Sequence, residues 1–313
     1  MKKGLFGIII SVLLILMTLT LFDGAPQVNT AVEPTPGGGS NAIVAGPPPF
    51  RAFWQMHGGE RILGRYVAGP CLYGDAVLGI YAAAVARISL TYPEEGARFY
   101  PINQDRREPP APQVNDPALL YRAGHNVPRL FVTFIKSLGG WAIVGNPVNE
   151  RYEDGANFCQ DFENLTLCFN QHTREVFINP TRGEAFYASH KAACQPLQRA
   201  PSAASNWHIQ MTADWAGDSV IQLKATMFFA GASQGVPADS RAIVEVFSSR
   251  NGEVLWLNVR TLAETNGVID AQIPVGYPDV SQGMARYVVR VCVWQQSDGL
   301  QACEETSVQR WYP

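Results

Sequence analysis

The first apolar stretch of the chain is unbroken over residues 4–22, and polar residues follow it directly. A helix over these 19 residues would be roughly 28 Å long at about 1.5 Å per residue, close to the thickness of a bilayer's hydrocarbon core. A cleaved secretory signal has a shorter apolar region and small residues at its cleavage site, whereas Ala25 is followed here by Pro26. The pattern therefore predicts an N-terminal transmembrane helix, an uncleaved signal anchor over residues 1–23, with a cleaved signal peptide as the alternative.

Charge and composition next to this stretch predict where the rest of the chain lies. Lys2 and Lys3 stand on the short N-terminal side of the apolar run, and basic residues favour the cytoplasmic side of a membrane. We therefore expect a cell-membrane protein with its N-terminus inside and an extracytoplasmic C-terminal body, or a secreted protein if the signal is cleaved. Residues 24–49 are rich in proline and glycine, which predicts a tether.

Short segments of alternating apolar and polar residues fill the C-terminal third of the chain. A linker is expected at residues 196–206, and seven strand-like segments follow it. They are Trp207–Thr212, Val220–Phe229, Ala242–Phe247, Val254–Leu262, Gly267–Ile273, Arg286–Trp294 and Glu304–Trp311. Seven strands in about 107 residues are typical of an immunoglobulin-like β-sandwich, which we predict for residues 207–313.

The middle of the chain contains an internal repeat. Aligning Phe50 with Phe131 also places Gly58-Gly59 on Gly139-Gly140, and Ile62-Leu63-Gly64 on Ile143-Val144-Gly145. Farther along, Ile88–Tyr92 matches Leu165–Phe169 at an offset that is shorter by four. Each copy predicts a short aromatic helix that ends at two glycines, a tight turn, and a β-hairpin. The copies are expected near residues 50–95 and 130–178, within a domain of residues 50–195.

Two more helices are expected around the second copy. Asp116-Pro117 can cap and start a helix over Ala118–Ala123, which Gly124 would end, and Gly183–Leu197 predicts another. The predicted fold is therefore mainly β with short helices. It has an α+β domain of two helix/β-hairpin repeats, followed by an all-β sandwich.

The second copy carries the more complete motif. It contains Gly139-Gly140-x-x-Ile-Val-Gly145-x-Pro147, then Asp154-Gly155, then Gln160-Asp-Phe162-Glu-Asn164. This pattern resembles the LGFP-type repeat of bacterial cell-envelope proteins. The first copy departs from it, with Arg65 and Tyr66 in place of Asn146 and Pro147, and with Ala82–Ala84 near the expected Gln-x-Phe-Glu. The resemblance implies association with the cell wall or cell surface and no catalytic role.

A second resemblance falls in the C-terminal domain. The stretch Gly283-x-x-Arg286-Tyr287-x-Val289-x-Val291 is similar to a strand of bacterial immunoglobulin-like domains, in which the tyrosine is often a corner residue. Such a domain implies a structural use as a spacer or an adhesion module.

All six cysteines lie in the part of the chain expected outside the cytoplasm, where thiols pair as disulfides. Cys292 and Cys303 are the clearest pair, because they lie on two adjacent predicted strands joined by a turn. The remaining four are Cys71, Cys159, Cys168 and Cys194, and the sequence leaves their three connectivities open. A zinc site would use His190 with Cys194, Cys159 and Cys168. No C-x-x-C pair supports one, so we expect no metal.

Composition excludes several classes of function. Hydrophobic residues make up 47% of the chain and charged residues only 16%, so it is not a disordered protein. The net charge is −3 and no cluster of basic residues occurs, so a nucleic-acid partner is not expected. The usual hydrolase and nucleotide-binding motifs are missing from the sequence, so we expect neither an enzyme nor a cofactor.

Three carboxylates and one histidine are the remaining candidates for catalytic groups. Asp154, Asp161 and Glu163 stand close together in the second copy, and a pair of carboxylates can act as general acid and base. We interpret them instead as solvated residues of a loop and a strand face. His57 is interpreted as a residue that caps the end of a helix.

Four aromatic residues are the candidates for ligand binding. Trp54, Tyr66, Trp141 and Phe158 flank the glycine turns of the two copies, and an exposed aromatic ring can stack on a sugar. The alternative is that these rings pack in the core of small repeats.

Three hypotheses of function follow. The first is a non-catalytic envelope protein whose repeats bind cell-wall or surface polymer, with cell-envelope polysaccharide or surface proteins as partners. The second is an accessory subunit of a larger membrane complex, held by its single anchor and using both domains as docking surfaces. The third, which we favour least, is an exported enzyme with an unrecognised site.

Overall fold

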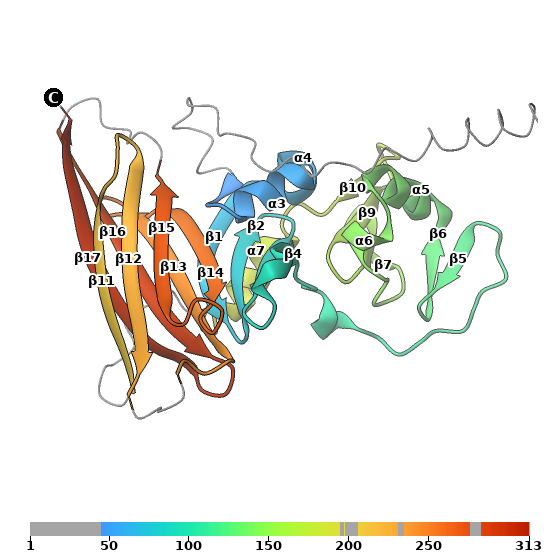
Figure 1. Ribbon diagram of the computed structural model, residues 1–313. Helices are drawn as coiled ribbons and strands as arrows, with labels where there is room; N and C mark the ends of the chain where they lie inside the picture. Colours follow the sequence, from blue (N-terminus) through green and yellow to red (C-terminus); the bar gives the residue numbers. More distant parts are fainter. Residues whose placement is uncertain (1–44, 195–196, 198–205, 231–234, 276–282, 313) are drawn as a thin grey trace, which may run out of the picture. The chain divides into compact units, whose positions relative to one another are not determined.

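The computed structural model describes residues 45–194, 197, 206–230, 235–275 and 283–312 of the chain. The predicted signal anchor and most of the tether lie outside these residues. Within the described ranges, no helix is long and apolar enough to cross a membrane. The described chain is mainly β with short helices, as the sequence predicts (Figure 1).

The first repeat unit starts with two short helices and continues into a four-stranded antiparallel sheet. The helices are α3 (Phe50–Met56) and α4 (Glu60–Leu63), and the strands, in sheet order, are β1 (Tyr66–Tyr73), β2 (Ala76–Tyr81), β3 (Val85–Ser89) and β4 (Ala97–Phe99). Two 3₁₀ turns follow β3 and β4, namely η1 (Pro93–Glu95) and η2 (Gln104–Arg106). Phe50 is fully buried against this sheet, and the hydroxyl of Tyr81 donates a 2.6 Å hydrogen bond to its carbonyl oxygen.

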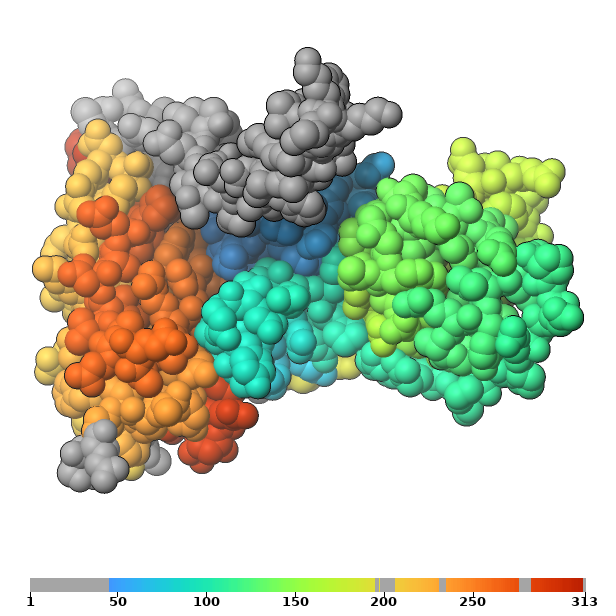
Figure 2. Space-filling view, turned by 45° about the vertical axis from the view of Figure 1, so that its right-hand side comes forward, coloured from blue at the N-terminus to red at the C-terminus, as the bar shows by residue number. Residues whose placement is uncertain are grey.

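The second repeat unit has the same order of elements behind an added hairpin. The hairpin pairs β5 (Leu119–Arg122) with β6 (His125–Pro128), and the helices are α5 (Arg129–Leu138) and α6 (Trp141–Val144). The sheet runs β10 (Val176–Ile178), β9 (Thr166–Asn170), β8 (Asn157–Asp161), β7 (Tyr152–Asp154), so β7 is an edge strand. Helix α7 (Arg182–His190) follows β10. In the space-filling view, the residues of α5 and the hairpin form a closely packed green surface (Figure 2).

The same backbone hydrogen bonds recur in the two units, in the alignment that places Phe50 on Phe131. The amide of Ala83 donates to the Leu63 carbonyl at 3.0 Å, and its equivalent, the amide of Asn164, donates to Val144 at 3.1 Å. The glycines that end α4 and α6, Gly64 and Gly145, both have a positive φ, of 74° and 88°. A side chain at either position would be strained, which accounts for a glycine in both copies.

The predicted match of Ile88 with Leu165 in the closing strand is wrong. Strands β3 and β9 are related by the same offset that places Phe50 on Phe131. The turns before these strands also close in the same way: Tyr81 N donates to Ala84 O, and Phe162 N donates to Leu165 O, each at 2.9 Å. The error has a physical reason. A slip of four residues is even, so it leaves every side chain on its original face of the strand, and alternation alone cannot detect it.

The helix expected at Ala118–Ala123 is also wrong, because these residues form the β5–β6 hairpin. Ala123 and Gly124 occupy its two-residue turn with φ values of 47° and 91°. Two consecutive residues with positive φ make the turn whose twist matches that of paired strands. Helix α7 is found where a helix was expected, but it ends at His190 and is shorter than Gly183–Leu197.

All seven predicted C-terminal strands are present. They are β11 (Trp207–Trp215), β12 (Val220–Phe229), β13 (Ser240–Ser248), β14 (Val254–Thr261), β15 (Val268–Pro274), β16 (Gly283–Gln295) and β17 (Gly299–Tyr312). They form a three-stranded sheet, β11-β12-β15, and a four-stranded sheet, β14-β13-β16-β17. Alternate residues of β12 and β16, such as Leu223 and Val291, point into one core that both sheets share.

Three disulfides account for all six cysteines. Cys292–Cys303 joins β16 to β17 as expected, and Cys159–Cys168 joins β8 to β9. Cys71–Cys194 links β1 to the segment after α7. These bonds occupy the sulfurs that the zinc alternative would need as thiolates.

Candidate functional site

The four aromatic candidates are partly buried, and each is engaged by neighbouring protein groups. The indole of Trp54 donates to the carbonyl of Gly64 at 2.8 Å, and the ring of Tyr66 packs edge-on against Tyr81 at 5.4 Å between centroids. Both pack against a buried hydrophobic cluster to which Phe50, Phe53 and Tyr81 of the first repeat unit belong. Burial raises the pKa of the Tyr66 hydroxyl, whose oxygen has no hydrogen-bond partner among the described atoms.

The other two aromatic candidates, Trp141 and Phe158, each have an arginine side chain stacked on the ring. The guanidinium carbon of Arg122 lies 4.1 Å from the ring centre of Trp141, and that of Arg151 lies 4.9 Å from the ring of Phe158. Trp141 also packs against the core, whereas Phe158 lies on β8. A stacked guanidinium occupies the ring face that a sugar would use.

A pocket of about 390 Å³ lies elsewhere, between edge strand β7 and the start of α7. It is open to solvent, and its volume falls within the range of roughly 300 to 1,000 Å³ that is usual for ligand pockets. Most of its lining residues have polar or charged side chains: Arg106, Tyr152, Glu153, Asp154, Asn179, Thr181, Arg182 and Ala185.

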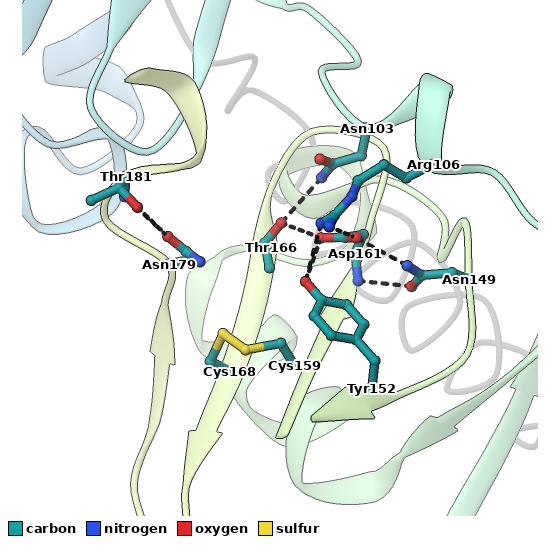
Figure 3. Close-up of a disulfide and its surroundings, with 10 residues drawn as sticks. All are labelled: Asn103, Arg106, Asn149, Tyr152, Cys159, Asp161, Thr166, Cys168, Asn179 and Thr181. Carbon is teal, nitrogen blue, oxygen red and sulfur yellow. Dashed lines mark hydrogen bonds and ion pairs between the residues drawn. A yellow bond between two sulfur atoms is a disulfide. The ribbon is translucent and has the colours of Figure 1, made fainter. Parts of the chain in front are cut away.

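Two of the lining residues, Arg106 and Tyr152, are held by the buried carboxylate of Asp161 behind them (Figure 3). Its Oδ2 accepts hydrogen bonds from Arg106 Nη1 at 2.7 Å and from Asn149 Nδ2 at 2.9 Å. Its Oδ1 accepts from the hydroxyls of Thr166 at 2.5 Å and Tyr152 at 3.2 Å. A buried carboxylate with four donors is fully satisfied, so it fixes the positions of the side chains that surround it.

Tyr152 and Arg106 extend from this network into the pocket. Burial, together with the charge of Asp161, raises the pKa of the Tyr152 hydroxyl to about 12. The hydroxyl therefore stays protonated and donates to Asp161 over the physiological pH range. Arg106 is bound through one nitrogen, but its side chain remains 42% exposed, so further N–H groups can reach a ligand.

The opposite wall is held by the segment that connects the two repeat units. Asn103 is fully buried, and its Nδ2 donates to the carbonyl of Phe162 at 2.7 Å. Its Oδ1 accepts from Arg182 Nε at 2.5 Å, and Arg182 also lies 3.7 Å from Asp105. The first turn of α7 is thereby tied to the second sheet.

The first repeat unit has apolar residues at the corresponding positions. Ile80 and Val85, which the alignment of the two copies places on Asp161 and Thr166, are fully buried. They form a cluster with Phe186 of α7 and with the disulfide partners Cys71 and Cys194. Helix α7 therefore closes this face in the first unit, while the second unit has a polar pocket beside the equivalent face.

The geometry does not favour general acid/base chemistry by the three carboxylates singled out in the sequence. The prediction that Asp161 is solvated is wrong, because four hydrogen bonds occupy the buried side chain. Glu163 pairs with Arg107 at 3.1 Å and accepts from the amide of Asn146 at 2.9 Å. Asp154 is exposed and lines the pocket.

Sequence reasoning missed most of the pocket. Arg106, Asn179, Thr181 and Arg182 come from segments in which the sequence pattern indicates no binding site. Tyr152 is a lone aromatic residue in a short strand, and no local pattern singles it out. Among the lining residues, only Asp154 is a candidate from the sequence.

Comparisons with known proteins add no assignment. No protein-family model matches the chain, and no curated protein matches it.

Proposed function

We propose that this protein is a non-catalytic component of the bacterial cell envelope, anchored in the membrane by residues 1–23, and that its second repeat unit binds cell-wall or surface polysaccharide. In this proposal residues 50–195 are a pair of LGFP-like repeats. Residues 207–313 are an immunoglobulin-like spacer that is joined to them by the linker at 196–206. The body lies outside the cytoplasm.

One observation carries the proposal. At the face where the first unit is closed by apolar side chains, the second has a solvent-exposed pocket in which Arg106 and Tyr152 are held in place by Asp161. Hydrogen-bonding groups fixed before binding reduce the ordering cost of association. A row of hydroxyl groups, as a polysaccharide presents, matches a lining that offers both donors and acceptors.

Several features support export and a non-catalytic role. Three disulfides form in the described chain, as is usual for proteins of oxidising compartments. The carboxylate that is best placed to act chemically, Asp161, is saturated by hydrogen bonds. The apolar run at residues 4–22 supports membrane attachment.

The test is sedimentation of the purified full-length protein with polysaccharide isolated from the envelope of its source organism, over a range of salt concentrations. Ala185 lines the pocket on an exposed position of α7, so Ala185→Trp fills the pocket without disturbing a core. Ala188→Trp, on an exposed position of the same helix outside the pocket lining, is the matched control.

We expect the wild-type protein and Ala188→Trp to sediment with the polymer, and Ala185→Trp to stay in solution. Failure of the wild-type protein to sediment at any salt concentration would overturn the proposal. In that case, a partner protein that co-purifies after extraction in mild detergent would identify an accessory subunit of a membrane complex.

A further inference from the structure

We infer that the pocket selects an uncharged, hydroxyl-rich saccharide and rejects acidic polymers, with Glu153 and Asp154 setting that choice. This inference rests on the proposed function and deepens it. It comes from the distribution of charge around the pocket, which includes two arginines and two carboxylates.

The two arginines do not form a free cationic site. Arg106 is paired with the buried Asp161 at 2.7 Å, and Arg182 lies 3.7 Å from Asp105 while its Nε donates to Asn103. Their charges are thus largely balanced by protein carboxylates. They remain available as hydrogen-bond donors.

The two carboxylates are in the opposite situation. Glu153 and Asp154 are exposed on the edge strand β7, and within the described chain no ion pair neutralises either side chain. The pocket therefore has an excess of negative charge, because ion pairs within the protein balance its arginines but not its carboxylates. A phosphate or uronate group entering the pocket would face the carboxylate of Asp154, and Glu153 adds a second negative charge from the other face of the strand, which disfavours acidic polymers.

The geometry of β7 also argues against a single bound cation. Consecutive residues of a strand point to opposite faces, so Glu153 and Asp154 diverge. The register places Asp154 on the face of Tyr152, opposite Asn157, whereas Glu153 lies opposite Phe158. Two diverging carboxylates cannot converge on one ammonium group, but each can accept hydrogen bonds from a separate hydroxyl.

Donors complete the match to a sugar. The Nδ2 group of Asn179 lines the opposite wall as a donor, and the exposed part of Arg106 is a second donor in the lining; the hydroxyl of Thr181 donates to Asn179 Oδ1 at 3.0 Å, so it can only accept from a ligand. A saccharide hydroxyl both donates and accepts a hydrogen bond, so it can bridge the acceptors on β7 and the donors at the start of α7. The volume of about 390 Å³ suits a short segment of a chain.

The experiment uses a partial hydrolysate of the isolated envelope polysaccharide, separated by charge into neutral, acidic and amine-bearing oligosaccharides. Binding of each fraction to the full-length protein in detergent is measured by calorimetry at low and high salt. The proteins compared are the wild type, the double variant Glu153→Gln/Asp154→Asn, and Glu175→Gln, which removes a charge from an exposed site of the same unit outside the pocket lining.

We expect the wild-type protein to bind the neutral fraction at least about tenfold more tightly than the acidic one, with little dependence on salt. The double variant should lose about fivefold or more for the neutral fraction and gain affinity for the acidic fraction. Glu175→Gln should behave as the wild type does.

Three results would overturn the inference: preference of the wild-type protein for the acidic or the amine-bearing fraction, absence of binding by the neutral fraction, or equal discrimination by the double variant. The proposed function is tested separately. If the intact polymer still sediments with the wild-type protein and not with Ala185→Trp, the proposed binding of polymer is supported. Only the inference that the ligand is an uncharged saccharide is then wrong.

Discussion

Glu245 makes the stability of the protein depend on pH in a way that one substitution should remove. Its carboxylate is buried on β13, 3.1 Å from Arg290 Nη1 on β16, and Arg290 Nε also pairs with Glu305 at 2.7 Å. Burial raises the pKa of Glu245 from 4.5 to about 7, although Arg290 opposes the shift. The folded protein therefore holds this proton more tightly than the unfolded chain does.

The sign of the effect follows from that difference. Below pH 4.5 the group is protonated in both states. As the pH rises from 4.5 to 7 the unfolded chain releases the proton first, so the folded state loses stability. A shift from 4.5 to about 7, at about 1.4 kcal/mol per unit, amounts to about 3 kcal/mol. That loss is complete above pH 7.

The assay is urea unfolding of the oxidised protein at several pH values between 4.5 and 8, for the wild type and for Glu245→Gln. Because other groups titrate alike in both proteins, the difference in their free energies of unfolding isolates Glu245. As the pH rises from 4.5 to 8, the free energy of unfolding of Glu245→Gln should increase by about 3 kcal/mol relative to that of the wild type. Glu305→Gln, at a side chain that is 40% exposed, should shift by less than about 1 kcal/mol. A Glu245→Gln difference that is the same at every pH would show that the pKa of Glu245 is not raised in the folded protein.

Three further predictions concern the repeat units. Asp161→Ala leaves two buried donors, Asn149 and Thr166, and two partly exposed ones without their acceptor. It should lower the free energy of unfolding by about 3–5 kcal/mol in urea titrations, and a loss under about 1 kcal/mol would contradict the role of the network. Gly183→Ala would place a Cβ against backbone oxygens of the first sheet and should cost about 1–3 kcal/mol, whereas Gly217→Ala, with open space around it, should leave the urea midpoint unchanged. Replacing both Cys71 and Cys194 by Ser removes a link across 123 residues and should lower the free energy of unfolding by about 3–5 kcal/mol. Amide exchange in α7 should become faster. Unchanged exchange there would show that the helix is held by packing alone.

The seven C-terminal strands were predictable because one face of each is buried. In β12 the alternation of buried and exposed residues is nearly complete, from Ile221 to Met227, and such a pattern has a period that only a strand satisfies. The repeat was predictable for a different reason. Its glycines occupy backbone conformations that other residues rarely adopt, so they recur at a fixed spacing.

The failures arise where local signals are ambiguous. Asp116-Pro117 followed by apolar residues is compatible with a helix start, but the conformations of Ala123 and Gly124 decide for a hairpin. The register of the closing strand was misjudged because an even slip preserves the alternation. In both cases pairing with a second segment determines the structure, and the local pattern does not contain that information.

The pocket is assembled from distant parts of the chain, which is why its residues could not be grouped beforehand. Arg106 and Asp161 are 55 residues apart, and Asn103 and Arg182 are 79 apart. An aspartate in an alternating strand is ordinarily assigned to the solvent face. Asp161 is buried instead because the connecting segment supplies Arg106 to neutralise it.

The most direct test of the account is hydrogen–deuterium exchange of the full-length protein with and without the isolated envelope polysaccharide. If the pocket binds the polymer, exchange should slow at residues 152–154 and 179–185, the two walls of the pocket, and Ala185→Trp should abolish this protection. Protection confined to the segments around Trp54 or Trp141, with the pocket walls unchanged, would contradict binding in the pocket.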